Sequence, residues 1–258
     1  MATIKFGPSG LGPVKEAIEN LEEYHRLGLE ACEVAFTYGA YIKKDDAIEI
    51  GKAAKKLGIF LSIHASYYVN LNSKEEEKIE ASKKRILKCC EIGHYLGAKR
   101  VIFHPGFYSG MESNEALGNI RDGIREMMAK VREEKWDIEL CPEVMGKKNV
   151  FGSIDEVSKL VEETGCGFCI DFAHVLARYG KYEFDEVLNA FPQKRWHCHF
   201  SGIDYGEKGE KNHKRTLPKY WEKVLKFMAG LDKEIVIVCE SPSPVEDSLL
   251  GKQIFERL

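Results

Sequence analysis

The chain has 258 residues, of which 44% are hydrophobic and 31% charged, and its formal net charge at pH 7 is −3. This length is enough to bury a full hydrophobic core, in one large domain or two small ones. No apolar run approaches the length that crosses a bilayer, and the first residues do not resemble a signal peptide, so we expect neither a membrane span nor secretion. The net charge does not indicate a polyanionic partner, although bound metal ions would add a local positive field.

The eight cysteines do not indicate a disulfide framework. Cys166 and Cys169 have the spacing of a redox motif, but they lie on a predicted strand without the helix N-terminus that activates such thiols. Five cysteines lie in apolar, strand-like runs, where a free cysteine acts as a small hydrophobic residue: Cys32, Cys141, Cys169, Cys198 and Cys239. We therefore expect a reducing compartment and a cytoplasmic protein.

The first half of the chain alternates short apolar runs with longer amphipathic segments. The apolar runs predict strands at residues 4–7, 31–36, 59–64 and 100–104. The amphipathic segments predict helices at residues 14–27, 45–57, 73–96 and 115–133. We expect Asp45 to cap the second helix, Ser73 and Glu76 to form a capping box at the third, and Gly58 and Gly97 to end them.

The second half continues the same alternation. Strands are predicted at residues 138–143, 167–171, 195–200 and 234–240. Helices are predicted at residues 154–163, 184–190, 217–229 and 245–258.

Eight predicted strands thus alternate with eight helical segments. The strands are continuously apolar, as expected when both faces of a parallel sheet are covered. With the chain length, this pattern predicts a (β/α)8 TIM barrel, an α/β fold, as a single domain over residues 1–258. A doubly wound open sheet is the alternative, but residues 7–12 after the first strand lack a glycine-rich phosphate-binding fingerprint and contain Pro8.

Potential metal ligands end six consecutive predicted strands. In a closed parallel barrel these ends face one rim, where active sites are built. A single histidine or glutamate at a strand end is more often a solvated rim residue, whereas six in succession are hard to reach by chance. Carboxylates that converge on one mouth repel each other unless cations are present, so a metal centre is predicted. The six residues are His64, His104, Glu143, Asp171, His199 and Glu240.

The predicted ligand set is larger than one ion needs. His174 follows Asp171 by three residues, and His213 lies after the seventh strand. The set allows two or three ions, with Glu143 as the natural bridging carboxylate because it is central in strand order. Clustered divalent ions are a device for phosphoryl chemistry, where they hold phosphate oxygens and lower the pKa of a bridging water.

Five segments at or beside the predicted strand ends carry a further signal: Ser62–Tyr67, Phe103–Gly106, Cys169–His174, His197–Phe200 and Cys239–Pro242. They resemble the signature segments of the endonuclease IV family, whose members are zinc-dependent barrel enzymes that incise DNA at abasic sites. The resemblance spans most of the chain in the right order. It implies one ion on His64, His104 and Glu143, a second on Glu143, Asp171, His199 and Glu240, and a third on His174, His213 and one aspartate.

Three positions depart from the family pattern. Lys211 stands where the family has the aspartate of the third site, and Glu210 or Asp204 is the candidate replacement. Val144 follows Glu143 where the family has asparagine, and a family arginine that wedges into DNA is replaced near Tyr41. Zinc is the implied metal, although histidine and carboxylate ligands also accept Mn²⁺ or Fe²⁺.

Aromatic residues near the predicted mouth bear on DNA binding. Tyr67 matches a family aromatic residue that inserts into the double helix, and Tyr41 lies in the loop after the second strand. Both are candidates for stacking on bases; packing on the rim is the alternative. The implied partner is double-stranded DNA with abasic sites, bound by a monomer.

The leading hypothesis is a metal-dependent phosphodiesterase that cleaves DNA 5′ to an abasic site. A metal-bridging hydroxide would be the nucleophile, positioned by Glu143 as the catalytic residue. The alternative enzyme is a sugar isomerase or epimerase of the xylose-isomerase-like barrel group, with one ion on Glu143, Asp171, His199 and Glu240. A non-enzymatic alternative is a nucleic-acid binding module, which the replacement at Lys211 would favour.

Overall fold

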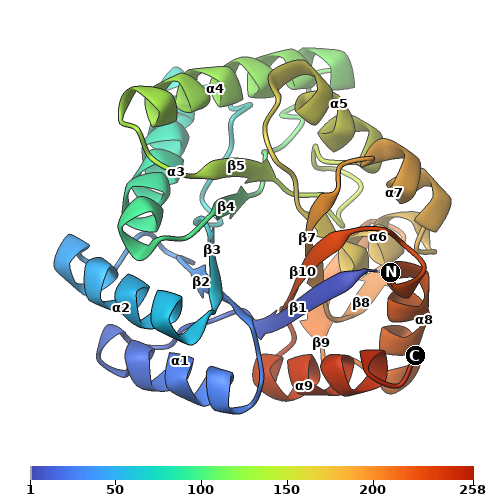
Figure 1. Ribbon diagram of the computed structural model, residues 1–258. Coiled ribbons are helices and arrows are strands. Elements are labelled where there is room, and N and C mark those ends of the chain that lie inside the picture. Colours follow the sequence, from blue (N-terminus) through green and yellow to red (C-terminus); the bar gives the residue numbers. More distant parts are fainter. Residues whose placement is uncertain (1) are drawn as a thin grey trace.

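Parallel strands form a closed barrel with helices packed around it, in the computed structural model that describes residues 2–258 (Figure 1). This arrangement confirms the predicted TIM barrel. The eight barrel strands are β1 (Thr3–Pro8), β2 (Ala31–Ala35), β3 (Phe60–His64), β4 (Arg100–Phe103), β5 (Glu139–Pro142), β6 (Ile170–Asp171), β7 (Arg195–Phe200) and β10 (Glu234–Cys239).

Among the described residues, the helices expected from the sequence follow the strands in order, and one further α-helix after β6 was not predicted. A short 3₁₀ helix, η1 (Val14–Glu16), leads into the first of them. The α-helices are α1 (Ala17–Arg26), α2 (Lys44–Leu57), α3 (Glu76–Leu96), α4 (Ser113–Glu133), α5 (Ile154–Thr164), α6 (Phe172–Tyr179), α7 (Phe184–Ala190), α8 (Pro218–Ala229) and α9 (Pro244–Phe255).

Two sets of four strands, β1-β10-β7-β6 and β2-β3-β4-β5, make up the barrel, and two short junctions close it. At the first junction, Gly10 N–H donates to Glu33 O at 2.8 Å, and Glu30 N–H donates to Phe6 O at 3.0 Å. Gly7 allows this close approach of β1 and β2, because a Cβ there would lie 1.8 Å from Ala31 O. At the second junction, Cys169 N–H donates to Pro142 O, and Val144 N–H donates to Cys169 O, both at 3.0 Å.

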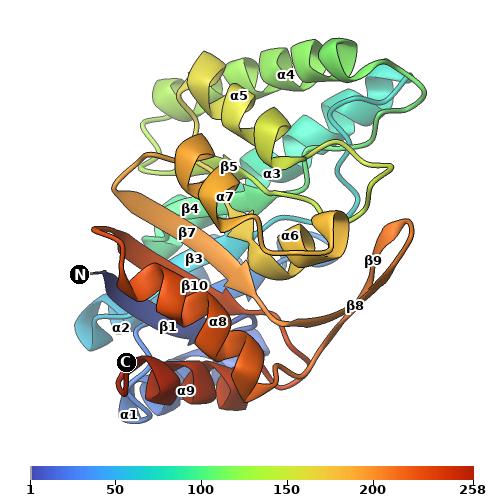
Figure 2. The same ribbon diagram turned by 90° about the vertical axis from the view of Figure 1, so that its right-hand side faces the viewer.

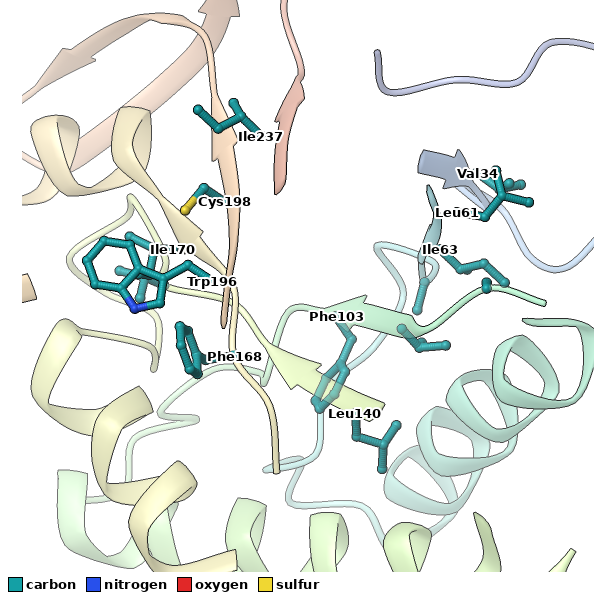
Figure 3. Close-up of a cluster of buried hydrophobic side chains, with 14 of the residues drawn as sticks. Val34, Leu61, Ile63, Phe103, Leu140, Phe168, Ile170, Trp196, Cys198 and Ile237 are labelled. Carbon is teal, nitrogen blue, oxygen red and sulfur yellow. The ribbon is translucent and has the colours of Figure 1, made fainter. Parts of the chain in front are cut away.

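Side chains alternate along each strand between the barrel interior and the helices. On β3, Leu61 and Ile63 belong to the main hydrophobic core with the helices, whereas Ser62 points inward and donates to Glu33 of β2. This alternation places the polar residues of neighbouring strands in one interior column. Figure 3 labels members of the main core: Val34, Leu61, Ile63, Phe103, Leu140, Phe168, Ile170, Trp196, Cys198 and Ile237.

Two elements near the mouth were not predicted. Helix α6 begins directly after Asp171, which caps it by accepting from His174 N–H at 2.9 Å. An antiparallel hairpin of β8 (Gly202–Gly206) and β9 (Gly209–Lys214) follows β7 and extends away from the barrel strands (Figure 2). Both elements carry predicted site residues, because α6 contains His174 and β9 contains His213.

Two predicted helix caps were wrong, and two predicted helix ends are confirmed. Helix α2 begins after Lys43 without a side-chain cap, so Asp45 lies inside its first turn. Helix α3 begins only at Glu76, and Ser73 Oγ accepts from Glu75 N–H, so these residues form no capping box. The expected ends hold, since Gly58 and Gly97 adopt left-handed conformations with φ of 71° and 68°. No helix within residues 2–258 is long and apolar enough to span a membrane.

Candidate metal centre

The eight predicted ligand residues lie at one mouth of the barrel: six come from the carboxyl ends of barrel strands, and the other two, His174 and His213, come from α6 and the hairpin. Their ligand atoms form overlapping groups, and the ligand atoms within each group lie within 4.8 Å of one another. Their role as metal ligands stays a prediction. The groups made up of predicted ligands alone are His64–His104–Glu143, His64–His199–Glu240, Glu143–Asp171–His199–Glu240 and Asp171–His174–His213.

Glu143 lies at the centre of these groups and is fully buried. It directly follows β5 and bridges to β6 through a backbone pairing with Cys169. Its Oε2 lies 3.1 Å from His104 Nε2 and 3.3 Å from His64 Nε2. Its Oε1 lies 3.0 Å from His199 Nδ1. One oxygen of the carboxylate therefore faces His64 and His104 and the other faces His199, an orientation that suits a carboxylate bridging two ions.

Asp171, His199 and Glu240 complete the second group. Asp171 and His199 are neighbours in the register of β6 and β7. His199 Nδ1 lies 3.6 Å from Glu240 Oε2, and Asp171 Oδ2 is buried without a hydrogen-bond partner among the described residues. A buried carboxylate oxygen without a donor is unfavourable unless a cation occupies the space beside it.

The third group joins α6 to the hairpin. His174 Nε2 lies 3.3 Å from His213 Nε2, a separation that two ligands of one tetrahedral ion would show. Glu210 Oε2 lies 3.5 Å from His174 Nε2, whereas Asp204 pairs with Lys214 across the hairpin. Of the two candidate replacements, Glu210 therefore lies beside His174, whereas Asp204 is paired with Lys214.

The carboxylates and imidazoles of the site stabilise each other's charged forms, with Glu143 in contact with several of the imidazoles. Burial alone would raise the pKa of Glu143, but contacts with His104, His199 and His64 hold the pKa well below its usual value. Burial alone would lower the pKa of His64, but Glu143 raises it to about 9. Burial would likewise lower the pKa of His174, but Asp171, Glu143 and Glu210 raise it to about 9. The carboxylates of this mouth thus attract positive charge, supplied by protons when no metal is bound.

The residues present fit a group of divalent ions. Imidazoles and carboxylates are the donor types that Zn²⁺, Mn²⁺ and Fe²⁺ use in proteins. The mouth also opens into a cavity of about 370 Å³. The cavity is lined by Ser9, His64, Tyr67, His104, His174, Glu210, His213, Glu240 and Ser241.

The two predicted DNA-binding tyrosines lie in different environments. Tyr67 is 57% exposed and lines the mouth, with its ring centre 5.4 Å from that of His104. Tyr41 is 47% exposed, but its ring packs edge-on against Phe36 and its hydroxyl donates to Gly12 O. Tyr67 is thus placed beside the candidate ligands, whereas Tyr41 is not among the residues that line the mouth.

Glu33, a fully buried carboxylate on β2, was not among the predicted site residues. Its Oε2 lies 3.2 Å from His197 Nε2 and accepts from Ser62 Oγ at 2.7 Å, and its Oε1 lies 3.0 Å from His199 Nε2. The signal was available, because an acidic residue inside the apolar run Ala31–Phe36 has to find a partner when it is buried.

Comparisons with known proteins agree with this architecture. The family model described as xylose isomerase-like TIM barrel matches residues 21–256. An uncharacterized protein of Methanocaldococcus jannaschii is 33% identical over 98% of this chain and 97% of its own length. An apurinic-apyrimidinic endonuclease of Caenorhabditis elegans is 30% identical over 56% of this chain, which spans only 40% of that relative. Endonuclease IV from Thermus thermophilus has the same fold, with a TM-score of 0.74 and 20% identity over 98% of this chain and 97% of that one. The chain therefore belongs to the xylose isomerase-like TIM barrel family.

Proposed function

We propose that this protein is a metal-dependent phosphodiesterase that incises double-stranded DNA 5′ to abasic sites. The observation that carries the proposal is the number of potential ligands at one mouth. Eight histidine, aspartate and glutamate side chains form overlapping groups there. A site for one ion has little use for His64, His104 and His174 in addition to a complete set of four ligands.

The comparisons support the substrate class. The relative from Caenorhabditis elegans is named an apurinic-apyrimidinic endonuclease, and the similar barrel from Thermus thermophilus is an endonuclease IV. DNA with abasic sites is therefore the substrate we assign to this chain as part of the proposal.

The ligand groups define which residues would hold the ions. His64, His104 and Glu143 would hold one, and Glu143, Asp171, His199 and Glu240 a second. His174 and His213, with Asp171 or Glu210, would hold a third. Zinc is the proposed metal. Divalent ions bound there would supply positive charge that stabilises the negative charge developing on the attacked phosphate.

The protein's own side chains have distinct tasks in this proposal. Glu143 stays ionised at neutral pH because its pKa is held well below its usual value, which favours a role in holding and spacing cations over one as a general base. Tyr67 presents an exposed ring beside the ligands and would stack on a base next to the lesion. Lys147, Lys208 and Lys211 line a second hollow beside the hairpin, where ammonium groups would contact the phosphate backbone.

The test is incision of a duplex that carries one tetrahydrofuran abasic-site analogue. We expect the zinc-loaded protein to cut 5′ to the analogue and leave a 3′-hydroxyl that a DNA polymerase extends. A chelator should abolish the cut, added Zn²⁺ should restore it, and an undamaged duplex should stay intact. Glu143→Gln should lose incision. Tight binding of the abasic duplex without incision under Zn²⁺, Mn²⁺ or Fe²⁺ would instead support a binding module.

A single-metal sugar isomerase or epimerase is the second candidate, because Glu143, Asp171, His199 and Glu240 form a complete group of four by themselves. In that enzyme the carboxylates would move protons beside a carbonyl. One tightly bound ion per chain and interconversion of ketose sugars, without incision of the abasic duplex, would favour this candidate.

A further inference from the structure

Strand β2 places a carboxylate directly beneath the candidate metal centre, where none of the proposed ions would use it. Glu33 is fully buried, and its charged oxygens contact only imidazoles and one hydroxyl. Among the described residues, no lysine or arginine lies within ion-pairing distance of it. A buried carboxylate without a cation is costly, so Glu33 needs the proton of each imidazole that it contacts.

His199 connects Glu33 to the proposed centre. Its Nε2 lies 3.0 Å from Glu33 Oε1, and its Nδ1 lies 3.0 Å from Glu143 Oε1. Both atoms are buried, and neither forms a hydrogen bond with a described residue, which leaves the 3.0 Å charge contact between them. The imidazole therefore directs Nε2 towards Glu33, below the mouth, and Nδ1 towards Glu143, in the mouth.

We propose that Glu33 is a positioning residue, which keeps a proton on Nε2 of His199 and thereby presents the Nδ1 lone pair to the ion held with Glu143, Asp171 and Glu240. This inference rests on the proposed metal centre. A carboxylate behind a metal-binding histidine fixes its tautomer and ring orientation and strengthens it as a ligand.

Contacts with neighbouring side chains fix the orientation of the Glu33 carboxylate. Ser62 Oγ donates to Oε2 at 2.7 Å, and His197 Nε2 lies 3.2 Å from the same oxygen. These contacts orient the carboxylate, so that Oε1 stays directed at His199. Ser62 and His197 are themselves fully buried, which excludes water as a competing partner.

The test compares Glu33→Gln with wild-type protein for Zn²⁺ affinity, measured by competition with a chromophoric chelator. Glu156→Gln is the matched control, because it removes the charge of another buried glutamate that does not contact the centre. We expect Glu33→Gln to weaken Zn²⁺ binding about 10- to 100-fold and the control to leave it unchanged. Equal affinities for wild type and Glu33→Gln would overturn the inference while leaving the metal centre in place.

A second measurement needs no substitution at Glu33. Long-range ¹H–¹⁵N spectra of zinc-loaded protein with ¹⁵N-labelled histidine report which ring nitrogen of His199 carries the proton, and His199→Asn assigns the signal. We expect the proton on Nε2 and the metal on Nδ1. The reverse arrangement would refute the role of Glu33 even if Glu33→Gln failed to fold. If wild-type protein binds no Zn²⁺, both this inference and the metal centre are wrong.

Discussion

Glu143→Gln should destabilise the metal-free protein in a way that depends on pH. Glu143 Oε2 lies 3.3 Å from His64 Nε2, and both side chains are buried. Burial lowers the pKa of His64, but this contact, with smaller contributions from Glu240 and Glu33, raises it from 6.5 to about 9. A pKa difference of this size corresponds to about 3 kcal/mol of stabilisation from the pair, at 1.36 kcal/mol for each tenfold change in proton affinity.

The sign of the pH dependence follows from linkage. The folded state binds the His64 proton more tightly than the unfolded state, so the stabilisation is fully present below the unfolded pKa near 6.5. It is lost as the pH rises through about 9, where folded His64 releases its proton. The difference in unfolding free energy between wild type and Glu143→Gln should therefore be about 3 kcal/mol at pH 6 and shrink steadily towards pH 10.

Urea unfolding of chelator-treated protein at half-unit intervals from pH 6 to pH 10 measures this difference. Glu156→Gln is again the matched control. The pKa of Glu156 is lowered, since hydrogen bonds from Ser113, Ser153 and Gly152 outweigh its burial. Its contribution is present above the unfolded pKa near 4.5 and stays constant from pH 6 to pH 10. If Glu143→Gln were as stable as wild type at pH 6, or if its deficit did not change with pH, the coupling between Glu143 and His64 would be wrong.

Three further predictions address stability, metal uptake and DNA binding. Glu156→Gln should lower the unfolding free energy by about 2 kcal/mol, because the Glu156 carboxylate accepts hydrogen bonds from Tyr108, Ser113 and two backbone N–H groups. Thermal or urea unfolding measures this loss, and a loss below about 0.5 kcal/mol would contradict the role of the carboxylate. Zn²⁺ binding at pH 7.5 should release about three protons per chain, from His64, His174 and His199, because the pKa values of all three imidazoles are raised in the metal-free state. Calorimetry in buffers of different ionisation enthalpy counts these protons, and a count of zero would refute the charge balance of the site. Tyr67→Ala should weaken binding of the abasic duplex by about tenfold and leave the Zn²⁺ content unchanged. Fluorescence anisotropy measures the binding, and undiminished binding would mean that Tyr67 only packs on the rim.

The sequence was most informative where short apolar runs end in polar residues. His64, Asp171, His199 and Glu240 each follow a buried run, and parallel strands in a barrel have to direct such ends to one rim. The fold and the convergence of the candidate ligands follow from that pattern without any knowledge of tertiary contacts.

Local sequence was less informative for the segments that complete the mouth. Helix α6 spans only Phe172–Tyr179 and joins β6 without a turn, so its apolar residues merge with those of the strand. The hairpin is mostly polar, and its turn at Gly206–Gly209 carries no strand-like alternation. The choice of Glu210 over Asp204 depends on the register of that hairpin, in which Asp204 lies opposite Asn212 and pairs with Lys214.

Glu33 shows a different limit. Its place in an apolar run indicates a buried charge, but its partners come from β3 and β7, far away in sequence. Only the closure of the barrel brings Ser62, His197 and His199 around it. Residues that support a site through other residues are therefore harder to find from sequence than the ligands themselves.

Native mass spectrometry of the purified chain, which counts bound ions directly, tests the central claim that this mouth holds a cluster of cations. We expect two or three Zn²⁺ ions per chain, and fewer on Glu143→Gln. A wild-type chain that takes up no ion, or one ion at most even in excess Zn²⁺, would contradict it.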